Sequence, residues 1–87
     1  MENKMVKFTY KSNKDYKTVF LAGDFTNWQD NPVMMKKGKG NTWFALAPLN
    51  KGEHEYKFIV DGQWMTDPSA SRKPNNIGSE NSIINVD

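Results

Sequence analysis

Residues 52–65 read G-E-H-E-Y-K-F-I-V-D-G-Q-W-M, and this stretch decides the fold. Its side chains alternate between a core-facing set, Tyr56, Phe58 and Val60, and an outward-facing set, Glu55, Lys57 and Ile59. A period of two residues is typical of a β-strand with one buried face. The dipeptide Asp61-Gly62 that follows is typical of the tip of a β-hairpin. We therefore expect Trp64 to lie beside a hairpin tip, where a large aromatic side chain is in contact with water.

Strand patterns recur along the rest of the chain. Five further segments have the period of a strand or a short apolar run: 5–11, 17–23, 31–37, 42–47 and 82–86. Pro32 cannot donate a ladder hydrogen bond, so it places the third segment at the edge of a sheet. No window has the period of a helix, and residues 66–81 read as a long polar connection. Short strands separated by Gly, Pro and Asn turns predict an all-β fold, either a sandwich or a small barrel.

The bulk composition narrows the function classes. With 87 residues, the sequence predicts one small domain over residues 1–87, although it could also be a piece cut from a larger protein. It has no cysteine, which excludes disulfides and zinc–thiolate sites and fits a reducing compartment. It shows neither a signal peptide nor the roughly 20 apolar residues needed to cross a membrane, so we expect a soluble, cytoplasmic protein. The net charge of +2 does not call for a polyanionic partner.

The sequence gives little support to catalysis. His54 is the only histidine, and its position on the core-facing side of a strand favours a structural role. The carboxylates Asp24, Asp61 and Asp67 fall at turns, where Asp is favoured for hydrogen bonding to the backbone. Nothing pairs them across a cleft as glycoside hydrolysis requires. We therefore expect no enzymatic activity, no metal site and no cofactor.

Binding of a single-stranded nucleic acid is the next alternative, since aromatic residues make up 13% of the chain. Lys36, Lys37 and Lys39 lie together near the middle of the sequence. They fall at a turn with few flanking aromatic residues, however, and the basic and aromatic signatures of that class are missing. The cluster is more typical of a solvated hairpin tip.

The tryptophans point to a neutral, hydroxylated ligand. Trp43 lies among apolar neighbours and is expected in the core, whereas Trp28 and Trp64 both follow strands in polar segments. Two aromatic side chains in such places favour a recognition surface. A flat indole matches the apolar C–H face of a pyranose, and amide or ammonium groups match its hydroxyls. Such polar groups come from the outward-facing Lys57 and from the segment that carries Asn75, Asn76, Ser79 and Asn81.

Three stretches carry a resemblance to a known family: V-F-L-A-G-D-F-T-N-W (19–28), the motif from Gly52 to Pro68, and N-N-I-G-S-E-N-S-I-I-N-V (75–86). They resemble the glycogen-binding module of the β subunits of AMP-activated protein kinase, within carbohydrate-binding module family 48. The resemblance covers roughly residues 17–86. It implies an immunoglobulin-like (early-set) β-sandwich of about seven short antiparallel strands, which binds α-1,4-linked glucans such as glycogen, starch and maltooligosaccharides.

The resemblance also implies roles for particular residues. The stacking aromatic residues fall on Trp28 and Trp64, and the groups that bind sugar hydroxyls fall on Lys57 and Asn81. In the loop that wraps the sugar, Ile77 stands where the family has Leu, and Ser79 stands where it has Thr. The expected partner is an α-glucan. The alternative is a domain that docks onto a kinase or a glucan-active enzyme and binds sugar weakly or not at all.

Overall fold

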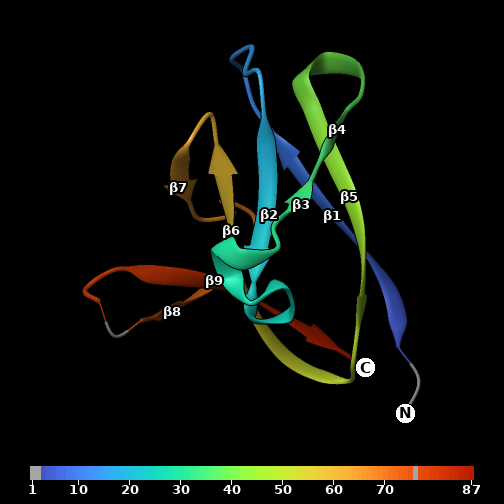
Figure 1. The fold of residues 1–87 in the computed structure, drawn as a ribbon, viewed down its shortest axis with the longest axis vertical. Coiled ribbons are helices and arrows are strands. Elements are labelled where there is room, and N and C mark those ends of the chain that lie inside the picture. Colours follow the sequence, from blue (N-terminus) through green and yellow to red (C-terminus); the bar gives the residue numbers. More distant parts are fainter. Residues whose placement is uncertain (1–2, 76) are drawn as a thin grey trace.

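The computed structural model describes residues 3–75 and 77–87, and it is a sandwich of two antiparallel sheets (Figure 1). The smaller sheet has the order β1 (Lys4–Lys11), β5 (Thr42–Leu49), β4 (Lys36–Lys37). The larger sheet has the order β3 (Val33–Met34), β2 (Val19–Gly23), β6 (Gly52–Val60), β9 (Glu80–Val86), β8 (Ser71–Pro74), and β7 (Gln63–Met65) also pairs with β6. The all-β sandwich prediction is confirmed. The described residues form nine strands rather than about seven, and β3 and β4 are only two residues long.

The core follows from the alternation seen in the sequence. Phe8 and Tyr10 of β1 contact Tyr56 and Phe58 of β6 across the sandwich, with ring centroids 4.9 Å and 5.1 Å apart. Trp43 is only 5% exposed, so its prediction as a core residue is confirmed. Burial of these aromatic side chains supplies much of the stabilisation available to so small a domain.

One expectation about the connections was wrong. Residues 66–81 are not one continuous polar connection, because β8 lies within them and β9 begins at Glu80. All four residues of β8 are exposed, so the strand has no apolar alternation by which the sequence could reveal it. The sequence also gave no sign of three short 3₁₀ helices, η1 (Asp24–Thr26), η2 (Trp28–Asp30) and η3 (Lys39–Asn41). In the described part of the chain, no helix has the length and apolar character required to cross a membrane.

Strand β6 forks, and the fork shapes one face of the molecule. Its residues 52–56 pair with β9, whereas residues 58–60 pair with β7. Both partners use the same edge of β6, because β2 occupies the other edge along residues 56–60. Lys57 lies between the two pairings, at the point where β7 and β9 diverge. The outer face of the larger sheet therefore opens beside Lys57.

A buried carboxylate holds the fork together. Asp67, in the connection from β7 to β8, is 8% exposed and accepts a hydrogen bond from the Tyr56 hydroxyl at 2.7 Å. Its backbone N–H donates to the Ser82 hydroxyl on β9, also at 2.7 Å, and its other carboxylate oxygen accepts from Ser69. Burial, together with the Asp67 hydrogen bond and charge, raises the pKa of Tyr56 far above its ordinary value. The phenol therefore remains a neutral donor that fixes the end of β7 to β6.

We expect Asp67→Ala to lower the free energy of unfolding by about 3 kcal/mol, because it removes a hydrogen bond to a charged group and leaves the buried Tyr56 hydroxyl without a partner. Tyr56→Phe is the matched variant, and it should cost about 1–3 kcal/mol by itself. In the Asp67→Ala background it should cost little, because its partner is already gone. Urea denaturation of the four proteins measures this coupling. Additive costs would contradict the role given to the Tyr56–Asp67 bond.

Candidate functional site

A hollow of about 540 Å³ lies over the fork of β6. Its lining residues come from β6, β7, β9, η2 and the turn between β8 and β9. They are Trp28, Gln29, Lys57, Trp64, Asn75, Ile77, Ser79 and Asn81. All six residues to which the resemblance gave a role therefore line one hollow, although they are spread over more than fifty positions of the sequence. Asn76, one of the amides noted in the sequence, lies outside the described residues.

Trp64 is one aromatic wall, and a rigid hairpin carries it. It lies on strand β7, opposite Ile59, rather than in the turn itself. The turn residues Asp61 and Gly62 have φ values of 46° and 86°, as a tight hairpin of this kind requires. The Asp61 carboxylate accepts from the backbone N–H groups of Lys17 and Thr18 at 2.9 Å and 2.8 Å. The indole is thus fixed at its base while 43% of its surface is exposed.

Trp28 is the second aromatic wall, and its backbone is strained. Asn27 and Trp28 have φ values of 53° and 54°, in the left-handed region that is unfavourable for a bulky residue. The buried Thr26 hydroxyl accepts from the Gly23 N–H at 3.0 Å, and the Trp28 carbonyl oxygen lies 2.9 Å from it as an acceptor. The Asn27 amide donates to the Asp30 carboxylate at 2.6 Å. These contacts hold the segment in a conformation that it would not adopt alone.

A chain of amide hydrogen bonds forms the polar side of the hollow. At one end, the Asn75 oxygen accepts from the backbone N–H groups of Ile77 and Ser79 at 3.2 Å and 3.0 Å. The Asn75 amide nitrogen then donates to the Asn81 oxygen at 3.1 Å, and the Asn81 nitrogen donates to the Glu55 carboxylate at 3.0 Å. N–H groups can only donate and a carboxylate can only accept, so the two ends fix the orientation of both amides.

Lys57 and Ile77 complete the site. The Lys57 ammonium group lies 3.4 Å from the Ser79 hydroxyl, and it has further hydrogens to donate. Ile77 is 83% exposed, which is unusual for so apolar a side chain. The hollow therefore combines two indoles, one exposed aliphatic side chain and several neutral polar groups around a single positive charge. Such a surface suits an uncharged ligand with an apolar face and a rim of hydroxyls.

The other candidates from the sequence have structural roles. Asp24, Asp61 and Asp67 each accept from a backbone N–H, as predicted for turn residues. His54 bonds with Asp24 and Asn50, which confirms the structural interpretation of its position. Over residues 3–75 and 77–87, no group of three or more His, Cys, Asp and Glu side chains could hold a metal ion.

The three lysines expected at one turn do not all lie there, because Lys36 and Lys37 form β4 of the smaller sheet and Lys39 lies in η3. Lys37 pairs with Asp15 and stands 5.9 Å from the centre of the Trp43 ring. It therefore covers a core residue and contributes nothing to the hollow.

Sequence reasoning missed two parts of the site. Glu55 was recognised only as outward-facing, although it shares a strand face with Lys57, and that was the one signal that could have revealed it. A second hollow of about 620 Å³ adjoins the first, and Lys57, Trp64 and Ser79 line both. The exposed indole of Trp64 therefore contributes surface to two hollows at once.

Comparison with known proteins identifies the family of the chain. A family model described as the glycogen recognition site of AMP-activated protein kinase matches residues 5–87. The chain is 43% identical over 70 residues to the β-1 subunit of 5′-AMP-activated protein kinase from Sus scrofa and to that from Homo sapiens. It is 41% identical over 70 residues to the human β-2 subunit. Each match covers 80% of this chain.

The matched region covers only part of each relative's length: 55% of the pig sequence and 25% of each human sequence. The all-β sandwich and the family match define the class of the protein, a carbohydrate-binding module. Since the family model matches nearly the whole chain, the protein belongs to the family of glycogen recognition sites of AMP-activated protein kinase.

The amide chain leads to a prediction for Glu55. In Glu55→Ala the Asn81 amide loses its acceptor, so the NMR signals of its side-chain NH₂ should shift and its hydrogens should exchange faster with water. Glu55→Gln, which still offers a carbonyl oxygen, should preserve the wild-type behaviour. If Glu55→Ala leaves the Asn81 signals unchanged, Glu55 does not orient Asn81.

Proposed function

We propose that residues 1–87 form a single non-catalytic domain that binds α-1,4-linked glucans such as glycogen, starch and maltooligosaccharides. Membership of the family supports carbohydrate recognition as the general function. One observation supports the finer assignment. Trp28 and Trp64 line the same hollow as Lys57, Ser79 and Asn81, the polar residues to which the resemblance gave hydroxyl-binding or loop roles.

In this proposal the two indoles stack on glucose rings. The apolar C–H face of a pyranose lies against a flat aromatic ring, and the exposed part of Trp64 is large enough to offer such a face. By analogy with base stacking on aromatic side chains, each stack would contribute about 1–3 kcal/mol. Two walls on either side of a hollow suit a curved polymer, and helical α-1,4-glucans are curved. Ile77 would press into the inside of that curve.

The polar groups would fix the sugar hydroxyls between the walls. The Lys57 ammonium group donates, the Ser79 hydroxyl can donate or accept, and Asn81 offers the amide hydrogen and oxygen lone pair left over from the amide chain. A sugar hydroxyl both donates and accepts, so a mixed set of this kind can satisfy it. A phosphate, by contrast, would need more positive charge than one lysine.

A docking role is the second candidate, since the relatives bear the name of kinase subunits. The occupant would then be another subunit of such a kinase or a glucan-active enzyme, and sugar binding would be weak. The cytoplasmic location stays a prediction. The expected absence of a cofactor stays a prediction too, as does the expected absence of a nucleic-acid or membrane partner.

Electrophoresis through native gels that contain glycogen or amylopectin tests the proposal. Trp64→Ala should weaken binding about tenfold to a hundredfold, because it removes one stacked ring, and the retardation of the wild type should largely disappear. Leu46→Ala is the matched control, since Leu46 is 57% exposed on the other sheet, and it should migrate like the wild type.

Dextran, an α-1,6-linked glucan, is the control polymer and should not retard either protein. A folded wild type that migrates equally in every gel, with no retardation by glycogen or amylopectin, would refute the glucan proposal and favour the docking role. Equal retardation of the wild type and Trp64→Ala would refute the stacking role of Trp64.

A further inference from the structure

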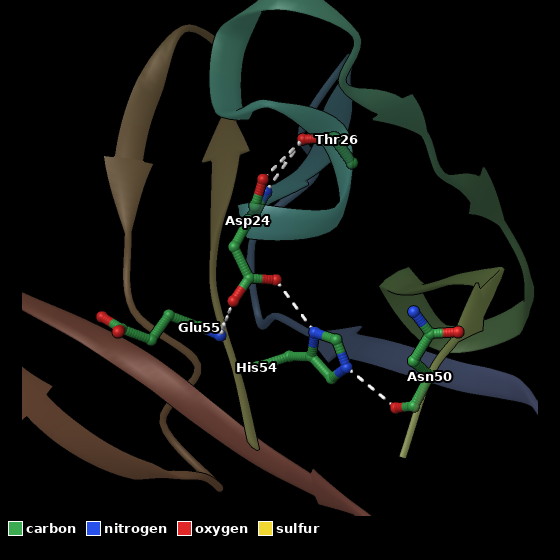
Figure 2. A network of polar contacts seen from close by, with 6 residues as sticks. Asp24, Thr26, Asn50, His54 and Glu55 are labelled. Atoms are coloured by element: carbon green, nitrogen blue, oxygen red, sulfur yellow. Dashed lines mark hydrogen bonds and ion pairs between the residues drawn. The ribbon is translucent and has the colours of Figure 1, made fainter. Parts of the chain in front are cut away.

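His54 is bonded through both of its ring nitrogens, beside the segment that carries Trp28. Its Nδ1 lies 3.0 Å from the Asp24 carboxylate, and its Nε2 lies 2.9 Å from the backbone oxygen of Asn50. Figure 2 shows the ring between these two partners, with the Glu55 side chain pointing away from it. The His54 side chain is only 16% exposed, so water cannot easily replace either bond.

The chemistry of the partners selects one protonation state. A carbonyl oxygen and a carboxylate both only accept hydrogen bonds, so each ring nitrogen must carry a hydrogen. The neutral imidazole has only one N–H. The lone pair of its other nitrogen would then face the oxygen of Asp24 or of Asn50, which cannot donate. The imidazolium ion satisfies both partners at once.

Asp24 connects this ring to the aromatic wall. The β2–β6 ladder ends at the pair formed by Gly23 and Tyr56. The next residue after Gly23 is Asp24, and its carboxylate accepts a hydrogen bond from the Glu55 N–H at 3.0 Å. The side chain thus extends the ladder just before the chain turns into the strained backbone of Trp28. A smaller hollow of about 360 Å³ is lined by Asp24 and Glu55 together with Trp28.

A strained backbone persists only where its surroundings hold it. Phe25 lies between the ladder and Trp28, and it packs on Phe8 and on the His54 ring at centroid distances of 5.6 Å and 6.1 Å. The start of this segment therefore depends on two contacts, the Phe25 packing and the Asp24 carboxylate. A neutral ring with its hydrogen on Nδ1 still bonds to Asp24, but only the charged imidazole makes that bond an ion pair and also donates to Asn50.

We propose that Asp24 and His54 are positioning residues for the glucan site, and that the charged His54 ring fastens Asp24 to β6 and so holds Trp28 in its binding position. This inference rests on the function proposed above. It predicts that the affinity for glucans falls as His54 loses its proton.

The surroundings of the ring support this assignment. Asp24 faces the ring from η1, and the β5–β6 turn contributes the Asn50 carbonyl, whereas Lys51 in that turn is exposed. Across the ladder, the β9 residue that pairs with His54 is the apolar Ile84. On its own strand, Glu53 and Glu55 face the other way and bond to Lys73 and Asn81.

The direction of the pH effect follows from these contacts. Burial by itself lowers the pKa of His54, but the bonds to Asn50 and Asp24 and the Asp24 charge outweigh it and raise the pKa above its ordinary value of 6.5. The contribution of the pair to stability is therefore complete below the pKa of the unfolded chain and is lost as pH rises through the higher pKa of the folded protein. Glucan affinity should follow the same curve.

Calorimetric titration with maltoheptaose from about pH 6 to about pH 9 tests the proposal. Affinity should weaken about threefold to tenfold over this range, as expected when one ordinary hydrogen bond is lost. The midpoint should coincide with the NMR titration of the imidazole, which is unambiguous because the chain has one histidine.

Three variants separate positioning from a general effect of pH. His54→Gln is neutral throughout and should bind with an affinity that does not depend on pH. Asp24→Asn should also lose the dependence, because its amide can donate to the unprotonated Nδ1. Asp15→Asn removes an exposed carboxylate that pairs with Lys37, and it should keep the wild-type curve.

The outcomes are distinguishable. A wild type that binds maltoheptaose equally at both ends of the range would overturn the positioning role and leave the proposed function intact. The same holds if His54→Gln keeps the wild-type dependence, so the test does not rely on Asp24→Asn folding. A folded wild type that binds no maltoheptaose at any pH would refute the proposed function, and this inference with it.

Discussion

Asp67 follows β7 and joins β6, through its carboxylate, to β9, through its backbone N–H, at the place where these strands separate, and the geometry of the hollow depends on that junction. β6 pairs with β9 before Lys57 in the sequence and with β7 after it, so no single strand covers this edge of β6. Without a hydrogen bond between the two segments, nothing would fix the distance between β7 and β9. Asp67 fixes the gap through Tyr56 on β6 and Ser82 on β9, both of which are buried. A buried, fully bonded carboxylate is costly to disturb, so the spacing of the strands is well defined.

The two aromatic walls are held by different means. Trp64 lies on a short hairpin whose turn is tied to the residues before β2 by Asp61. Trp28 lies on a strained segment that is held by Thr26 and, in our proposal, by the Asp24–His54 pair. If the indoles bind a glucan as proposed, both arrangements fix them before the ligand arrives, and this reduces the conformational entropy lost on binding. They differ in sensitivity, because only the second contains a group that changes charge near neutral pH.

The sequence predicted the sandwich for clear physical reasons, and the family resemblance named the six residues that line the hollow. Residues 56–60 of β6 alternate over the core, so the outward direction of Lys57 could be read directly. Trp43 was separated from the other tryptophans because its neighbours are apolar. β8 was missed because both of its faces are exposed, which leaves no periodic signal. The amide chain through Asn75, Asn81 and Glu55 depends on contacts between distant segments, and no local pattern encodes those.

The left-handed backbone of Asn27 and Trp28 was equally hidden, since neither is a glycine and the contacts that hold them come from η1 and β6. Local propensity is overruled here by hydrogen bonds between segments, which is common near binding sites. The family resemblance gave the position of Trp28, but the means by which it is held came only from the structure.

The measurement that tests the central claim most directly is a titration of the ¹⁵N-labelled protein with maltoheptaose, followed through its indole N–H signals. The chain has three tryptophans, so three signals are expected. If the fork presents a glucan site, the signals of Trp28 and Trp64 should shift with one common dissociation constant, and that of the buried Trp43 should stay in place as an internal reference. If all three signals stay unchanged, or if only one of the two indoles that line the hollow responds, the two walls do not form a single glucan site.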